Sequence, residues 1–249
     1  MTRKSISLVI AAVLAACGTG ATPASTTTPG ISASPTVKPS PTPLMSGGVL
    51  VCIEGQPYPA GRQLMTEDST LLGFPLAITM TDGWTGCGLH YKELGDPGGI
   101  MMIGTWDVAN VYRNPCTWKT SLPTVPVGST VDDLVTALVD QEITDATKPS
   151  DVELDGYRGK YLRLSVPAGF KSTCDRDVNS TVEEFRFLNG QGDAVWWLGA
   201  GDATGIVGDV WVLDVGGKRV LIQAASFADA GEARREELKG IIGSIDFMP

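Results

Sequence analysis

The sequence is poor in histidine and in charge. His90 is the single histidine among 249 residues, and 19% of the residues are charged, against about 25% in a typical domain. Catalytic triads and zinc sites depend on imidazole or clustered thiols, and the chain also lacks the G-x-S-x-G, H-E-x-x-H and C-x-x-C spacings. We therefore expect no catalytic residue, metal or cofactor, and we expect His90 to be a surface or hydrogen-bonded strand residue.

Basic residues are scarce as well. Lys and Arg total 19 and Asp and Glu total 28, which gives a net charge of −9. A chain this acidic lacks the excess of positive charge that binds a phosphate backbone, so we expect no nucleic-acid partner. The hydrophobic share of 43% is that of a folded protein, so disorder of the whole chain is excluded.

The first residues form a signal for export. Arg3 and Lys4 precede an apolar run of eleven residues, 6–16, which is too short for a membrane-spanning helix of about 20 residues. The run ends in Leu-Ala-Ala-Cys17-Gly, which resembles the bacterial lipobox. The resemblance implies that residues 1–16 are a lipoprotein signal peptide. It also implies that Cys17 carries lipid and holds the protein on the extracytoplasmic face of the cell membrane. The alternative is an ordinary secretory peptide with an incidental cysteine.

Residues 17–47 are expected to form a linker after the lipidated cysteine. Residues 18–47 contain six prolines and many serines and threonines, with Lys38 as the only charge. Such a segment has almost nothing apolar to bury, so it is expected to stay disordered.

Residues 48–249 are long enough for one hydrophobic core, and their pattern predicts a single α+β domain with a mostly antiparallel sheet. The clearest element is a hairpin over 210–224, in which Gly216 and Gly217 suit a two-residue turn. Its arms are apolar on both faces, which is typical of strands inside a sheet. Further strands are expected over 77–80, 88–92, 160–166, 183–188, 194–198, 207–215 and 244–248. In the strand over 160–166, Leu162, Leu164 and Val166 should point inward.

About two main helices are expected on this sheet. Thr130 is placed to cap the first, with Asp133 three residues later in the capping-box position. Its apolar stripe comprises Val131, Leu134, Val135, Leu138 and Val139. The second helix is expected to begin at Asp229, with Glu232 completing a capping box.

Five segments carry a resemblance to a known group: GWTGCGLHYKE, VANVYRNPCTW, VGSTVDDLVTAL, LDGYRGKYLRLSVP and VWVLDVGGKRVLIQAASF. Together they are similar to a group of actinobacterial lipoproteins and secreted proteins of no assigned activity. The hairpin followed by a terminal helix and strand also looks like the PsbP-type α/β/α sandwich of LpqN-type lipoproteins. The first resemblance implies an envelope lipoprotein, and the second implies a fold without a function.

Two loops have a pattern typical of ligand sites. Residues 198–205 are rich in glycine, but a strand follows them and a phosphate loop would open a helix, so we interpret them as an ordinary loop. Asp175, Asp177 and Asn179 alternate and are followed by Glu183 and Glu184. Alternating oxygen ligands suit calcium, yet the turn glycine and bidentate glutamate of an EF-hand are absent, so a solvated acidic loop is favoured.

The six tryptophans provide the best lead to a ligand site. Trp196 and Trp197 are adjacent, so a regular strand would point them to opposite faces and leave one of them outside the core. An exposed ring of this kind can stack on a ligand such as a sugar, so Trp196 and Trp197 are the candidate ligand-binding residues, beside the plain core role that large aromatic side chains usually have.

The remaining cysteines form an even set in an oxidising compartment. Cys52, Cys87, Cys116 and Cys174 allow three disulfide connectivities, and the sequence alone does not choose among them. Cys52–Cys87 with Cys116–Cys174 is the set that we favour.

Taken together, these features predict a membrane-anchored extracytoplasmic lipoprotein with a non-catalytic binding or scaffolding domain. Its partners would be the membrane, through the lipid anchor, and cell-wall glycan or another envelope protein. The alternative hypothesis is a cell-envelope hydrolase that uses acidic residues such as Asp175 or Glu183.

Overall fold

The computed structural model describes residues 55–65, 72–95, 99–120, 127–166, 174–175, 184–188, 194–199, 206–227 and 230–249, with the backbone alone for 184–188 and 194–199. The chain divides into two units, residues 1–43 and 44–249, and every described residue belongs to the second. The predicted signal peptide, Cys17 and linker lie outside the described residues. Within those residues, no helix combines the length and the apolar character needed to cross a bilayer.

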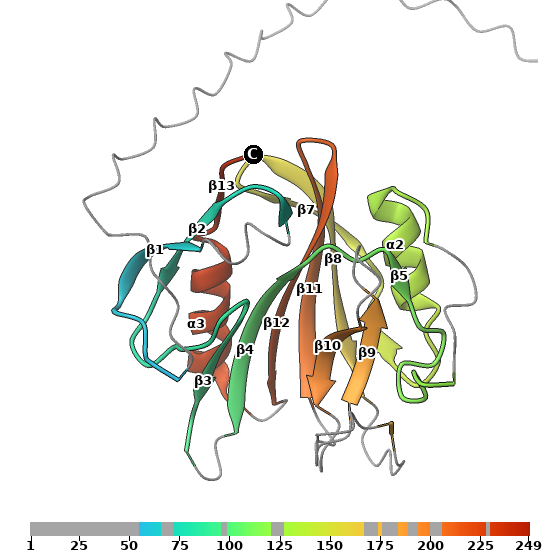
Figure 1. Ribbon diagram of the computed structural model, residues 1–249, viewed down its shortest axis with the longest axis horizontal. Coiled ribbons are helices and arrows are strands. Elements are labelled where there is room, and N and C mark those ends of the chain that lie inside the picture. The colour runs from blue at the N-terminus through green and yellow to red at the C-terminus, as the bar shows by residue number, and fades with distance from the viewer. Residues whose placement is uncertain are drawn as a thin grey trace, which may run out of the picture. The chain divides into compact units, whose positions relative to one another are not determined.

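A large antiparallel sheet forms the centre of the second unit (Figure 1). Its strand order is β3-β4-β12-β11-β8-β6, and β7 also pairs with β8. These strands are β3 (Leu89–Glu93), β4 (Ile100–Trp106), β6 (Asp145–Ala146), β7 (Ser150–Leu154), β8 (Tyr157–Ser165), β11 (Ile206–Val215) and β12 (Lys218–Phe227).

The predicted hairpin is confirmed as β11 and β12, which lie in the middle of this sheet between β8 and β4. Gly216 and Gly217 both adopt positive φ angles, 63° and 86°, as a two-residue type I′ turn requires. The apolar character of both arms fits this position, because side chains on opposite faces of the hairpin contribute to two different hydrophobic cores.

Two small antiparallel sheets accompany the large one. One has the order β1-β2-β13, with β1 (Gly61–Met65), β2 (Leu76–Met80) and β13 (Asp246–Phe247); the other has the order β10-β9-β5, with β5 (Asn110–Val111), β9 (Glu184–Leu188) and β10 (Ala194–Gly199). The predicted strands on either side of Asp82 and Gly83 exist, but β2 and β3 pair with different partners and belong to different sheets.

The large sheet separates two hydrophobic cores. Along β12, Leu221 and Ala225 belong to one core, and Val220, Ile222 and Ala224 belong to the other. This alternation follows from the two-residue period of a strand. Helix α2 (Val131–Val139) contributes to the first core and helix α3 (Glu232–Ile242) to the second. We call them the α2-side core and the α3-side core. Two helices on a mostly antiparallel sheet confirm the predicted α+β class.

The first helix begins as predicted. Thr130 is the N-cap of α2, its hydroxyl accepts a hydrogen bond from the Asp133 N–H, and the Asp133 carboxylate accepts one from the Thr130 N–H. Hydrogen bonding of the Asp133 carboxylate to the side chain and the backbone N–H of Thr130 lowers the pKa of Asp133. Leu134, Val135 and Leu138 are buried beneath the helix, as the apolar stripe requires.

The second helix begins later than predicted. Its N-cap is Gly231, which has a φ of 83° and makes no side-chain capping bond, and the first helical residue is Glu232. The prediction of a capping box that opens at Asp229 is therefore wrong. A glycine tolerates the left-handed backbone at this cap without steric cost, and the buried side chains of Leu238, Ile241 and Ile242 anchor the helix instead.

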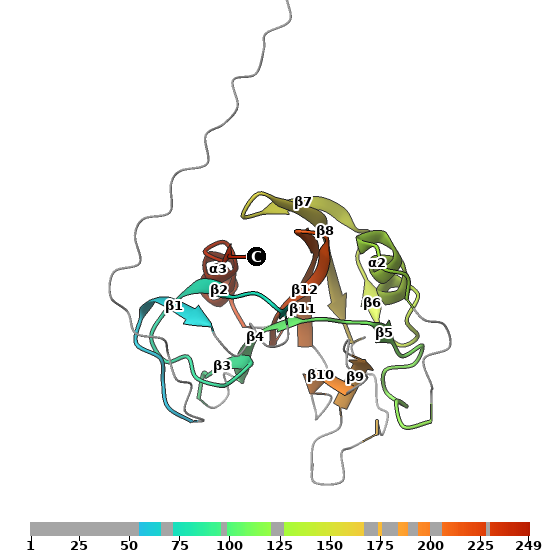
Figure 2. The same ribbon diagram turned by 45° about the horizontal axis from the view of Figure 1, so that its top comes forward.

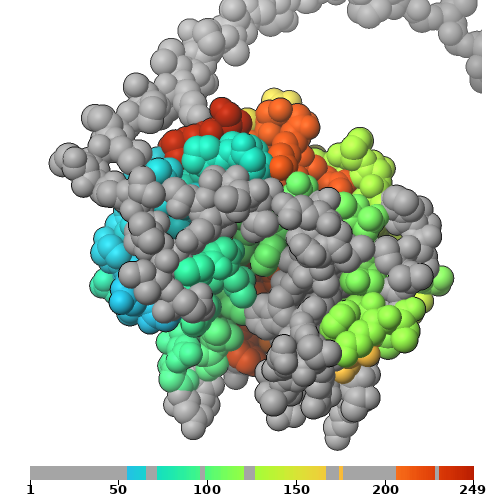
Figure 3. Space-filling view, in the orientation of Figure 1, coloured from blue at the N-terminus to red at the C-terminus, as the bar shows by residue number. Residues whose placement is uncertain are grey.

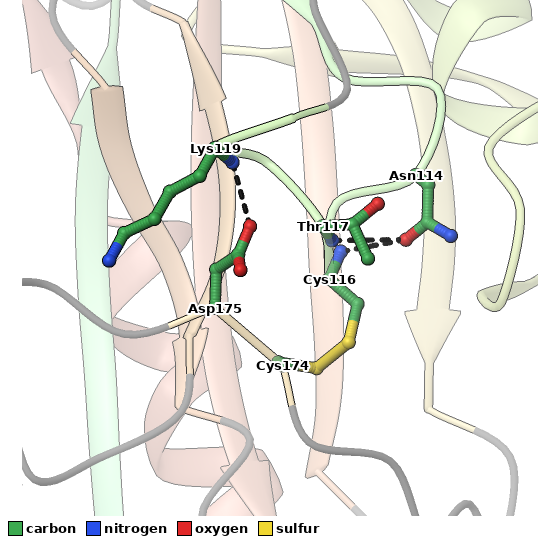
Figure 4. Close-up of a disulfide and its surroundings, with 6 residues drawn as sticks. All are labelled: Asn114, Cys116, Thr117, Lys119, Cys174 and Asp175. Atoms are coloured by element: carbon green, nitrogen blue, oxygen red, sulfur yellow. Dashed lines mark hydrogen bonds between the residues drawn. A yellow bond between two sulfur atoms is a disulfide. The ribbon is translucent and has the colours of Figure 1, made fainter.

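A disulfide joins Cys116 to Cys174 in the α2-side core, with an S–S distance of 2.06 Å. It is one of the two pairs favoured from the sequence. In Figure 4 the Asn114 side chain accepts hydrogen bonds from the N–H groups of Cys116 and Thr117 at 3.0 and 3.3 Å. Cys87 is disulfide-bonded too, and Cys52 lies outside the described residues, so the pairing Cys52–Cys87 stays a prediction.

Candidate functional site

Strands β8 and β11 place four chemically distinctive side chains on one face of the large sheet. Tyr161 is paired with Trp211, and Arg163 with Asp209. All four residues are half-buried, whereas the intervening residues of both strands are buried in the α2-side core: Leu162, Leu164, Val210 and Val212. We call the set Tyr161, Arg163, Asp209 and Trp211 the aromatic patch.

The two rings of the aromatic patch are in contact. The centroids of Tyr161 and Trp211 are 5.3 Å apart and the ring planes are tilted by 51°. Trp211 also packs against the α3-side core. These contacts restrict the ring although the residue is only half-buried. Aromatic pairs in such geometry add about 0.5–1.5 kcal/mol beyond the area that they bury. The contact therefore holds both rings in place at the surface of the sheet.

Arg163 and Asp209 form a two-point ion pair beside the rings. Arg163 Nε donates to Asp209 Oδ1 at 2.9 Å, and Arg163 Nη2 donates to Asp209 Oδ2 at 3.3 Å. The Arg163 side chain is 39% exposed and that of Asp209 is 17% exposed. A forked pair of this kind fixes the plane of the guanidinium, so Arg163 is held in one orientation.

Tyr161 completes the network. Its hydroxyl donates to Asp209 Oδ1 at 2.5 Å. Burial raises the pKa of Tyr161 to about 12, and the hydrogen bond to Asp209 and the charge of that carboxylate act in the same direction. The phenol therefore stays protonated at physiological pH. Both oxygens of Asp209 accept hydrogen bonds from Tyr161 or Arg163, which suits a fixed scaffold better than a proton-transfer group.

Two donors of the aromatic patch remain available to a ligand. Within the described residues, Arg163 Nη1 and Trp211 Nε1 have no hydrogen-bond partner. Neither atom is among the buried, unpaired polar atoms of the described side chains, so both are reached by solvent. The aromatic patch thus combines two rings held in contact with two N–H donors that have no partner within the described residues.

The hairpin of β7 and β8 borders this face of the sheet (Figure 2). Asp155, in the turn of the hairpin, accepts a hydrogen bond from the Phe247 N–H at 2.9 Å. The rings of Tyr157 and Phe247 lie edge to face with centroids 5.7 Å apart. Because β13 carries Phe247, these contacts tie the end of β8 to the small sheet next to α3. Strand β8, which carries Tyr161, is therefore held in place at its N-terminal end.

The predicted platform at Trp196 and Trp197 lies on β10, where only the backbone is described. Trp196 pairs with Arg186 of β9, and the register shifts between Trp196 and Leu198. Such an irregularity interrupts the strict alternation of faces that the sequence argument assumes. Ligand binding by these two tryptophans stays a prediction.

The other candidate residues are engaged in structural contacts. His90 lies on β3, is 3% exposed, and its Nδ1 is 3.0 Å from the Tyr58 hydroxyl. It is therefore a hydrogen-bonded strand histidine. The Asp175 carboxylate accepts a hydrogen bond from the Lys119 N–H at 2.7 Å beside the disulfide (Figure 4). Asp177, Asn179 and Glu183 lie outside the described residues. Among the described residues, no cluster of three or more His, Cys, Asp or Glu side chains could hold a metal ion.

A pocket of about 460 Å³ lies at the opposite end of the β11–β12 hairpin from Asp209, lined by Asp107, Val108, Ala109, Val127, Ser129, Gly217, Lys218 and Arg219. Figure 3 shows this hairpin end, in orange, at the surface near the light-green segment that contains α2. Lys218 Nζ is 3.2 Å from an Asp107 carboxylate oxygen.

Arg219 has a structural role beside this pocket. Its Nη1 donates to the carbonyls of Gly128 and Thr130, and its Nη2 donates to the Val108 carbonyl at 2.5 Å. Burial lowers the pKa of Arg219. Because the guanidinium is used to join three segments of the chain, we favour the aromatic patch over this pocket as the functional site.

Sequence reasoning missed the aromatic patch for a specific reason. The alternation over 160–166 implies that Tyr161 and Arg163 lie opposite the inward leucines, but the hairpin over 210–224 was interpreted as apolar on both faces, so Trp211 did not stand out. The sequence does contain one indication: Asp209 lies two residues before Trp211, so a strand places this polar residue and Trp211 on the same face. Only the pairing of β8 with β11 shows that these residues meet.

Comparison with family models gives no match, and comparison with curated proteins gives none either. Among solved structures, the chain is similar to the solution structure of cyanobacterial PsbP from Synechocystis sp. PCC 6803, with 13% identity and a TM-score of 0.35 over 83% of this chain and all of that chain. It is also similar to a crystal structure from Bacteroides thetaiotaomicron VPI-5482, with 9% identity and a TM-score of 0.29, over 70% of this chain and 45% of that chain.

Proposed function

We propose that the protein is a lipid-anchored extracytoplasmic lipoprotein with a non-catalytic binding or scaffolding domain, akin to the actinobacterial lipoproteins that its sequence segments resemble. The Leu-Ala-Ala-Cys17 motif supports the anchor. Residues 18–47 are rich in proline and carry only one charge, Lys38, a composition that is typical of a linker between an anchor and a folded domain.

The aromatic patch is the observation that supports binding most directly. Its two rings are ordered, its carboxylate is bonded on both oxygens, and its two outward donors have no partner among the described residues. Preorganised groups of this kind lose little conformational entropy when a ligand arrives. The patch lies on the middle strands of the sheet, so binding would not disturb the fold. The partner is cell-wall glycan or another envelope protein.

The anchor is tested by the intact mass of the protein in the membrane fraction. We expect a chain that begins at Cys17 and carries added acyl mass, and we expect Cys17→Ser to release the protein or leave it unprocessed. A mature chain that begins elsewhere and carries no lipid would refute the anchor.

Binding is tested by co-sedimentation of the full chain with insoluble cell envelope from an actinobacterium. We expect Trp211→Ala to remove most of the sedimenting protein, because the largest apolar surface of the patch is lost. Trp118→Ala is the matched control, since Trp118 is also half-buried but lies near the disulfide. Equal sedimentation of both variants and the wild type would show that the aromatic patch is not the binding surface.

A further inference from the structure

We infer that the aromatic patch recognises neutral sugar units of a polysaccharide. This inference rests on the proposed function and specifies the ligand that the same surface binds. Four observations support it: the contact between the two rings, the two N–H donors without a partner, the paired charges of Arg163 and Asp209, and the paired backbone of β8 and β11.

The rings provide the apolar part of sugar recognition. A pyranose presents C–H bonds on its faces and hydroxyls around its rim, so it binds best where an aromatic surface lies next to hydrogen-bonding groups. Tyr161 and Trp211 are held in contact at 5.3 Å and remain half-buried. Their tilt of 51° forms an angled surface rather than a flat one, which suits one sugar ring placed against Trp211 with its edge toward Tyr161.

The free donors provide the polar part. Arg163 Nη1 and Trp211 Nε1 can both donate to sugar hydroxyl oxygens, and Asp209 fixes the guanidinium that carries one of them. The side chain of Arg163 therefore needs little ordering when the ligand binds. Tyr161 reinforces this arrangement, because its raised pKa keeps its proton on the bond to Asp209.

The charges favour a neutral ligand over an anionic one. Arg163 is already paired with Asp209, so the two charges of the patch cancel. A phosphate or carboxylate ligand would have to compete with Asp209 for the guanidinium fork. The whole chain carries a net charge of −9, which also repels anionic polymers.

The backbone disfavours an extended peptide as the ligand. A peptide that adds a strand needs an unpaired sheet edge, but β8 and β11 are interior strands here. β8 pairs with β11 on one side and with β7 and β6 on the other, and the Arg163 N–H and C=O bond to Thr147. A ligand can therefore reach this face only through side chains, as a sugar does.

The test uses the full chain and one defined probe in three preparations. The probe is insoluble actinobacterial cell wall that is treated with protease, with hydrogen fluoride to remove phosphate polymers, or with periodate to cleave sugar diols. We expect co-sedimentation to survive the protease and hydrogen fluoride treatments and to fall at least about tenfold after periodate. Soluble maltoheptaose, whose glucose units carry the vicinal diols that periodate cleaves, should compete, and a galacturonate tetramer should not.

Conservative variants test whether the two N–H donors of the patch contribute to binding. Trp211→Phe keeps an aromatic ring and removes Nε1, and Arg163→Lys keeps the charge opposite Asp209 and removes the planar fork. We expect each variant to weaken the apparent affinity about threefold to tenfold, which corresponds to the loss of one or two contacts. Trp118→Phe should leave it unchanged. Because all three replacements are conservative, far-UV circular dichroism of each variant should match the wild type.

The outcomes separate this inference from the proposed function. Binding that depends on Trp211 but is lost after protease treatment identifies a protein partner, and loss after hydrogen fluoride identifies an anionic polymer; either result overturns the sugar inference and leaves the binding function standing. Binding that is unchanged in Trp211→Phe, Trp211→Ala and Arg163→Lys overturns the sugar inference and shows that the aromatic patch is not the binding surface. Loss after periodate together with a response to Trp211→Phe supports both the sugar inference and the proposed function.

Discussion

The two faces of the β8–β11 strand pair differ in chemistry although alternating residues of the same two strands form them. On one face, Leu162, Leu164, Val210 and Val212 are 0% exposed and pack under α2. On the other face, the aromatic patch is half-buried and bonded mainly to itself. The difference teaches that one pair of strands can fix the fold with one set of side chains and display a binding surface with the other.

This difference predicts that substitutions on the two faces affect different properties, stability on one face and ligand binding on the other. Substitutions on the buried face should change the free energy of unfolding and leave the binding surface intact once the protein is folded. Substitutions on the aromatic patch should change ligand binding with little change in stability.

The largest effect on stability is expected from removing the disulfide of the α2-side core. Cys116 and Cys174 are separated by 58 residues, and opening a loop of that size should lower the free energy of unfolding by about 4 kcal/mol. The double variant Cys116→Ser with Cys174→Ser, unfolded in urea, measures the loss. A midpoint equal to that of the wild type would contradict the assignment of this pair to the stable core.

Leu162→Ala should have the next largest effect. Leu162 is 0% exposed, and truncation of such a side chain typically costs about 2–5 kcal/mol. The matched control is Arg163→Ala, its neighbour on the opposite face, whose half-exposed ion pair should contribute under about 1 kcal/mol. Urea unfolding of both variants measures the contrast. Similar losses from the two substitutions would break the comparison between the faces.

Thr130→Ala should have a smaller effect, because it removes only the cap of α2. The expected loss is about 1 kcal/mol, since the Asp133 N–H loses the Thr130 hydroxyl as its acceptor. Thermal unfolding followed by circular dichroism is the measurement. Thr130→Ser retains a hydroxyl acceptor and should restore most of the loss, and a Ser variant as weak as the Ala variant would exclude capping as the cause.

The smallest effect concerns the pH dependence of stability. The pKa of Tyr161 is raised to about 12, whereas an unfolded tyrosine has a pKa of about 10. As pH rises above about 10, the unfolded chain releases this proton before the folded protein does. The contribution of Tyr161 is therefore complete below pH 10 and is lost as pH rises through about 12.

Urea unfolding between pH 9 and 11.5 should show that decline in the wild type and a weaker decline in Tyr161→Phe. Absorbance at 295 nm should show one fewer phenol titrating late in that variant. Identical slopes for the two proteins would show that the bond from Tyr161 to Asp209 does not favour the protonated phenol.

Local features of the fold were predictable from the sequence. The alternation over 160–166 identified the buried leucines, the Thr130 and Asp133 spacing identified the cap of α2, and paired glycines identified the hairpin turn. Each of these depends on residues close together in the chain. The start of α3 at Gly231 was missed because a glycine with positive φ replaces the side-chain cap that the pattern favoured.

The candidate site was less predictable because it depends on contacts between distant segments. Arg163 meets Asp209 across 46 residues of sequence, and Tyr161 meets Asp209 across 48. A shift of one residue in the β8–β11 register would move every side chain to the other face, and composition does not fix that register. The adjacent pair Trp196–Trp197 drew attention for its spacing, whereas Trp211 is isolated in the sequence.

The most direct test of the central claim follows the indole N–H signals of the tryptophans by nuclear magnetic resonance while solubilised cell-wall saccharide is added. Trp211 is half-buried and its Nε1 has no hydrogen-bond partner within the described residues, whereas Trp84 is 0% exposed and its Nε1 donates to Glu237 Oε1 at 3.1 Å. We predict that the Trp211 signal, assigned by its loss in Trp211→Phe, shifts in a saturable manner and that the Trp84 signal stays in place. Saturable binding that leaves the Trp211 signal unmoved would contradict the account.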